Sequence, residues 1–102
     1  MQIKVHMRAF MDKGNIRMVE VPDADLKNAS QDTLLNFVFV NGQNEIQSQK
    51  MPSVSMGDIV ELPDGTYHLI AGVGFKSITK EQLDKIPGNF ATTPEYFKML
   101  YK

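Results

Sequence analysis

The segment from 53 to 78 constrains the fold of this chain more than any other part of its sequence. Two runs rich in β-branched and aromatic residues, Ile59–Leu62 and Thr66–Ala71, are separated by a Pro-Asp-Gly turn that contains Asp64 and Gly65. Proline fixes φ at the start of such a turn, and Asp-Gly supplies the positions that need positive φ. The pattern therefore predicts a β-hairpin at the centre of the fold.

Two further features complete this central unit. A third short strand follows the hairpin and ends at Ile78, and a turn at Gly57 and Asp58 starts the first strand. We expect the Asp58 carboxylate to accept backbone N–H groups and fix this turn rather than act in catalysis. Gly57, Asp58, Asp64 and Gly65 are therefore predicted to be structural turn residues.

The chain before the central unit carries a second hairpin signal and a helix signal. Apolar and polar residues alternate over Ile3–Phe10, and after a Gly-containing turn apolar residues continue over Ile16–Val21, which predicts two paired strands. The segment 31–40 follows Ser30, a favourable N-cap, and precedes Gly42, so it is predicted to be a helix. A strand remains an alternative for its Phe-Val-Phe-Val end.

Two short helices are predicted after the central unit. Thr79 and Gln82 match a capping box, in which the hydroxyl and the amide each bond a backbone N–H group of the other residue. Thr93, followed by proline, is a second start signal, and the helix that it opens carries the aromatic residues Tyr96 and Tyr101.

Together these elements predict a single α+β domain over residues 1–102. We expect a curved, mostly antiparallel sheet or partial barrel of about four or five strands, with about two or three short helices packed on one side. The central hairpin would supply the middle of the sheet, and the helix at 31–40 would cover one face. A chain of 102 residues is long enough for one hydrophobic core but not for two.

The central unit also resembles a known family. From Ser53 to Ile78 the sequence follows the pattern Ser-x-Ser-x-Gly-Asp-Ile-Val-x-Leu, then a turn, then Tyr-x-Leu-Ile-x-x-x-Gly-Phe-Lys-x-Ile. This pattern is similar to the core of the YodL-like family of small bacterial, phage and mobile-element proteins, and Gly42–Glu45 is similar to what precedes that core in related phage proteins. The resemblance implies a fold unit and a phage or mobile-element setting, and it implies no catalytic residues.

Composition excludes several kinds of chemistry. The chain has no cysteine, which removes disulfides, thiolate catalysis and cysteine-ligated zinc, and its formal net charge of −1 gives no reason to expect binding to bulk nucleic acid or an anionic membrane. The N-terminus alternates polar and apolar residues and matches neither a signal peptide nor a membrane span. We therefore expect a cytoplasmic protein, in a bacterial cell or a phage-infected host, without membrane contact.

The two histidines and one acid are the candidates for catalysis or metal binding. His6 lies on the polar face of the first predicted strand, and His68 follows Tyr67 on the central hairpin, so His68 and Tyr67 point to opposite faces. No metal-binding histidine spacing is present. We predict no metal, no cofactor and no catalytic residue; an enzymatic function would require His68 and Asp58 to converge in a pocket.

Our leading functional hypothesis is a non-enzymatic interaction protein that binds a host or phage protein, with self-association as a further possibility. Exposed aromatic residues and methionines suit binding surfaces. The predicted binding residues are Gln43, Asn44, Tyr67, Phe75, Lys76, Tyr96 and Tyr101. The alternative is a small β-barrel nucleic-acid-binding module, which requires Lys4, Arg8, Arg17, Lys76, Tyr67 and Phe75 to share one face.

Overall fold

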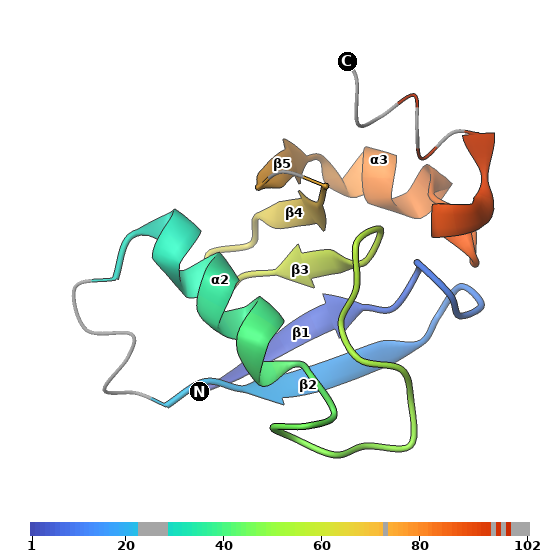
Figure 1. Ribbon diagram of the computed structural model, residues 1–102. Helices are drawn as coiled ribbons and strands as arrows, with labels where there is room; N and C mark the ends of the chain where they lie inside the picture. Colours follow the sequence, from blue (N-terminus) through green and yellow to red (C-terminus); the bar gives the residue numbers. More distant parts are fainter. Residues whose placement is uncertain (23–28, 73, 95, 97, 99–102) are drawn as a thin grey trace.

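Five short strands form one open antiparallel sheet in the order β2-β1-β3-β4-β5 (Figure 1). The computed structural model describes residues 1–22, 29–72, 74–94, 96 and 98. The strands are β1 (Gln2–His6), β2 (Ile16–Glu20), β3 (Ile59–Glu61), β4 (Tyr67–Ile70) and β5 (Phe75–Ile78). All neighbouring strands are antiparallel, and β3 lies in the middle of the sheet. The predicted α+β class and the three-strand central unit are confirmed.

Helix α2 (Gln31–Asn41) covers one face of the sheet (Figure 1). The Ser30 hydroxyl accepts the Thr33 backbone N–H group at 3.2 Å, as expected of an N-cap. Leu35 and Val38 are buried against strand residues that include Val60. The helical prediction for this segment is confirmed through its end, so the strand alternative for its last residues is wrong.

The opposite face carries α3 (Lys80–Lys85) and the 3₁₀ turn η1 (Phe90–Thr92). Leu83, Ile86 and Phe90 pack against β3, β4 and β5 residues in a second buried cluster, which lies on the opposite side of the sheet from α2. Consecutive strand residues point to opposite faces, and β3 and β4 carry apolar side chains on both. The expectation that the helices pack on one side is therefore wrong.

Local signals in the turns and caps are confirmed where the structure describes them. Thr79 and Gln82 form the capping box at the start of α3. Asp64 accepts hydrogen bonds from the backbone N–H and the hydroxyl group of Thr66, at 3.0 and 2.5 Å, and Gly65 has a φ of 86°. Most of the predicted C-terminal helix, including Tyr101, lies outside the described residues.

Candidate functional site

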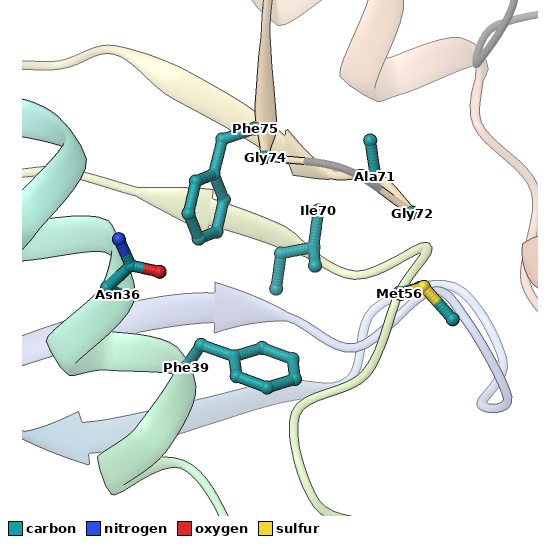
Figure 2. Close-up of a pocket in the computed structure, with 8 residues that line it drawn as sticks. All are labelled: Asn36, Phe39, Met56, Ile70, Ala71, Gly72, Gly74 and Phe75. Atoms are coloured by element: carbon teal, nitrogen blue, oxygen red, sulfur yellow. The ribbon is translucent and has the colours of Figure 1, made fainter.

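An apolar pocket of about 210 Å³ opens between α2, the loop before β3 and the turn that joins β4 to β5 (Figure 2). The side chains of Phe39, Ile70 and Phe75 point toward one another around it (Figure 2). The described residues that line it are Asn36, Phe39, Met56, Ile70, Ala71, Gly72, Gly74 and Phe75. An apolar concavity of this kind can hold an apolar side chain of another molecule.

The turn that joins β4 to β5 forms one border of the pocket. The Ala71 backbone N–H group donates to the Gly74 carbonyl at 3.1 Å, and Gly74 has a φ of 71°, a conformation that favours glycine. Directly beyond this turn Ile70 and Phe75 are cross-strand partners on the α2 face. Outside its two chain neighbours, a Cβ atom added at Gly74 would meet nothing within 4 Å among the described residues.

The rim of the pocket combines a flexible apolar group with one polar group. Met56 is 51% exposed although it is apolar, and its thioether chain can adapt to different shapes. The Asn36 amide donates to the Asp32 carbonyl at 3.0 Å, which leaves the Asn36 side-chain oxygen on the pocket side (Figure 2). The site therefore offers apolar contact together with one hydrogen-bond acceptor.

Among the predicted binding residues that the structure describes, Phe75 is the one that lines this pocket. Tyr67 and Lys76 lie on the opposite face of the sheet, since Tyr67 pairs with Ile78 and packs against the α3 cluster. Tyr96 is buried, and its ring contacts Phe90 edge-to-face with the centroids 5.4 Å apart. Met56 and Phe39 line the pocket, but neither is among the predicted binding residues.

Gln43 and Asn44 are bound within the chain. The Gln43 amide donates to the carbonyls of Phe39 and Val54 at 2.8 and 2.9 Å. The Asn44 amide donates to Met51, and its side-chain oxygen accepts from Arg17 at 2.7 Å. Both residues therefore fix the loop between α2 and β3, and the prediction that they contact a partner is untested.

The loop between α2 and β3 is held by a fully buried arginine. Arg17 donates to the Asn44 side-chain oxygen at 2.7 Å, to the Pro52 carbonyl at 2.9 Å and to the Gln47 carbonyl. Burial lowers the pKa of Arg17, but a guanidinium stays protonated in proteins. Carbonyl oxygens therefore solvate this buried cation and tie the loop to β2.

The side chains required by the nucleic-acid alternative do not share a face. Arg8 is buried and donates to the carbonyls of Leu83 and Ile86 at 3.0 and 2.7 Å, which satisfies the C-terminal end of α3. Arg17 is buried on the α2 face, whereas Lys4 pairs with Glu61 on the opposite one. No basic surface therefore forms from this set.

The two histidines also lie on opposite faces. His6 is 3.0 Å from the Glu61 carboxylate, and its ring centroid is 6.1 Å from that of Tyr67. His68 is buried beneath α2, and its Nε2 atom is 2.8 Å from the Thr66 hydroxyl; burial lowers the pKa of His68. Within the described residues, no group of three or more histidine, aspartate or glutamate side chains is arranged to hold a metal ion.

Asp58 has the structural position that the sequence predicts. Its two carboxylate oxygens accept the backbone N–H groups of Ala9 and Ser55, each at 2.8 Å, and the carboxylate is buried. Burial raises the pKa of Asp58 to about 6, and the hydrogen bonds from backbone N–H groups oppose that rise. Asp58 thereby joins the chain after β1 to the turn before β3.

This raised pKa predicts a pH-dependent stability. Because the folded chain binds the Asp58 proton more tightly than the unfolded chain, the contribution of Asp58 to stability is greatest below pH 4 and falls as the pH rises through 6. The shift from 3.8 to about 6 corresponds to about 3 kcal/mol at most. Urea unfolding of wild type and Asp58→Asn from pH 4 to 7 measures this contribution, because the pH dependence from all other titrating groups cancels in the difference between the two unfolding free energies. A difference that is constant with pH would contradict the prediction.

Comparison of the chain with protein-family models, curated proteins and solved structures finds no match. What the structure establishes is therefore a class of fold, an open antiparallel α+β sheet with helices on both faces and an apolar pocket beside one edge. In the part of the chain that is described, no helix has the length and apolar character needed to cross a membrane.

Proposed function

We propose that this chain is a non-enzymatic interaction protein of the phage or mobile-element type, which binds a host or phage protein in the bacterial cytoplasm. The observation that supports this proposal most is the apolar pocket, whose rim carries the exposed Met56 and whose wall includes Phe75. Both residues lie in the segment 53–78 that resembles the YodL-like core. Two residues of the proposed binding site therefore lie in the region that carries the family resemblance.

The lining of the pocket supports a partner side chain as its occupant. Phe39, Ile70 and Phe75 are apolar, and none of the described lining residues is charged. A charged substrate would find no opposite charge there, whereas an apolar side chain would remove this lining from water at a gain of about 25 cal/mol per Å² of apolar surface. The Asn36 oxygen provides one polar contact that fixes orientation.

A pair of matched substitutions tests the proposal. Met56 and Ile46 are exposed apolar residues, 51% and 59% accessible, but only Met56 lines the pocket. In a pull-down from bacterial lysate treated with nuclease, we expect wild type and Ile46→Glu to retain a common protein and Met56→Glu to lose it. A charge in an apolar contact costs several kcal/mol, so the expected loss is at least about 100-fold in affinity.

Two results would contradict the proposal. Equal retention by Met56→Glu and Ile46→Glu would show that the pocket does not bind the partner. A partner protein that is recovered from untreated lysate but lost after nuclease treatment would favour the nucleic-acid alternative instead. Circular dichroism of both variants provides the folding control, because substitutions at exposed positions change stability little.

A further inference from the structure

Strand β5 forms an edge of the sheet, and its outward backbone groups accept or donate no hydrogen bond among the described residues. The Ile70 N–H group donates to the Asp58 carbonyl, on the β3 side of β4. Because backbone groups alternate in direction along a strand, the residues next to Ile70 bond β5 instead. By the alternation of antiparallel ladders, Lys76 and Ile78 bond β4, and the N–H and C=O groups of Phe75 and Ser77 point outward. The hydrogen bonds of the described residues include none at these four groups.

At the other edge of the sheet, β2, side chains bond some of the outward backbone groups. The Gln47 side chain accepts the outward N–H group of Glu20 at 3.0 Å and donates to its carbonyl at 2.6 Å. Gln49 donates to the outward carbonyl of Met18 at 2.9 Å. Side-chain amides thus occupy backbone groups along β2, as expected of a protein that protects an edge strand, and β5 has no such cover among the described residues.

The open groups lie beside the pocket. Phe75 presents its side chain to the pocket and its backbone N–H and C=O groups to the free edge. A residue paired with Phe75 on an added strand would place its side chain on the same face of the sheet, next to the Phe75 ring. The backbone edge and the apolar pocket can therefore be engaged by one extended segment.

We propose that β5 is the docking edge for an extended segment of a partner protein, which adds as a further antiparallel or parallel strand and places an apolar side chain against Phe75. The proposal rests on the proposed function and specifies its mode of binding. Main-chain hydrogen bonds to Phe75 and Ser77 supply affinity, and the pocket selects the apolar residue. The partner is recognised by its extended backbone and one large apolar side chain.

A second copy of this chain is a poor occupant of the same edge. An antiparallel β5–β5 pair that uses the outward groups of both Phe75 and Ser77 has its two-fold axis at Lys76. That register places the two Lys76 side chains directly opposite each other, and like charges at opposed positions destabilise a sheet. The sequence of the edge therefore favours a different chain as the added strand.

Hydrogen exchange on the full chain tests the proposed mode. The probe is a synthetic peptide selected from a display library of short random peptides by binding to the intact protein. In the free chain the Phe75 and Ser77 amides should exchange much faster than those of Lys76 and Ile78. With saturating peptide, both outward amides should slow by at least about tenfold, and isotope-filtered NMR should show contacts from the peptide backbone to both residues.

Two variants sharpen this test. Ser77→Pro deletes one outward N–H group and leaves the bonds between β5 and β4 in place, so peptide affinity should fall by about tenfold. Ser77→Ala keeps the N–H group and should bind as wild type does. If Ser77→Pro does not fold, the exchange measurement on wild type still decides the outcome.

The outcomes separate strand addition from the role of the pocket. Peptide binding that requires Met56 but leaves the Phe75 and Ser77 amides unprotected would overturn strand addition and keep the proposed function. Protection of both amides by a peptide that binds Met56→Glu equally well would keep strand addition and overturn the role of the pocket. Protection of these amides already in the free chain, or a library that yields no binding peptide, would overturn the inference.

Discussion

Replacing Arg17 by methionine is expected to lower the free energy of unfolding by about 3 kcal/mol. Methionine keeps much of the apolar stem but removes every hydrogen bond from the guanidinium to the loop between α2 and β3. The carbonyls of Pro52 and Gln47 then lose their donors in a part-buried site, which costs about 1–3 kcal/mol for each group that stays dry. Urea unfolding followed by circular dichroism measures the change.

Lys4→Met is the matched control for this substitution. Lys4 lies in the neighbouring strand β1 but is exposed, so the same change in side-chain chemistry should alter stability by less than about 0.5 kcal/mol. A similar unfolding midpoint for Arg17→Met and wild type would contradict the prediction. Such a result would mean that water can replace the guanidinium at the loop carbonyls without lowering the free energy of unfolding, and that the contact between the loop and β2 does not stabilise the fold.

Replacing Gly57 by alanine is expected to destabilise the chain by a similar amount, about 3 kcal/mol. Gly57 has a φ of 100°, and an added Cβ atom would lie 3.2 Å from the Cβ atoms of both Ala9 and Ala91. The Ala91 N–H group also bonds the Ala9 carbonyl at 3.1 Å, so these two neighbours cannot separate without breaking a backbone bond. Backbone strain and close packing therefore act together.

Gly14→Ala separates the two causes. Gly14 has nearly the same φ, 103°, but an added Cβ atom there would meet nothing within 4 Å. Thermal or urea unfolding of Gly14→Ala reports backbone strain alone, about 1–2 kcal/mol. The excess loss in Gly57→Ala reports the crowding against Ala9 and Ala91. Equal losses in the two variants would show that the turn before β3 can relax around a methyl group.

Local sequence signals predicted the parts of the fold that depend on neighbouring residues. The turn at Asp64 and Gly65, the N-cap at Ser30 and the capping box at Thr79 each involve residues within a few positions of one another. The pairing of β1 with β3 joins distant segments, and no local pattern specifies it. The placement of α3 on the second face likewise depends on which side of the assembled sheet remains apolar.

The candidate site was only partly predictable for the same reason. Phe75 could be singled out because it is a large aromatic residue at the end of the central unit. That Phe75 shares a pocket with Phe39 depends on where α2 crosses the sheet, which no local sequence pattern specifies. The polar character of Gln43 and Asn44 suggested a surface role, but an amide serves equally well to satisfy buried backbone groups.

The two edge strands of the sheet, β2 and β5, differ in how many of their outward backbone groups are hydrogen-bonded, and this difference affects how many molecules can assemble. At β2 the side chains of Gln47 and Gln49 already bond the outward groups of Glu20 and the Met18 carbonyl, whereas the described residues leave the outward groups of β5 unbonded. Sheets that accept strands at both borders can grow into open-ended polymers. If a partner adds to β5 as we propose, strand addition is expected at β5 rather than at β2, so each molecule should take up one partner.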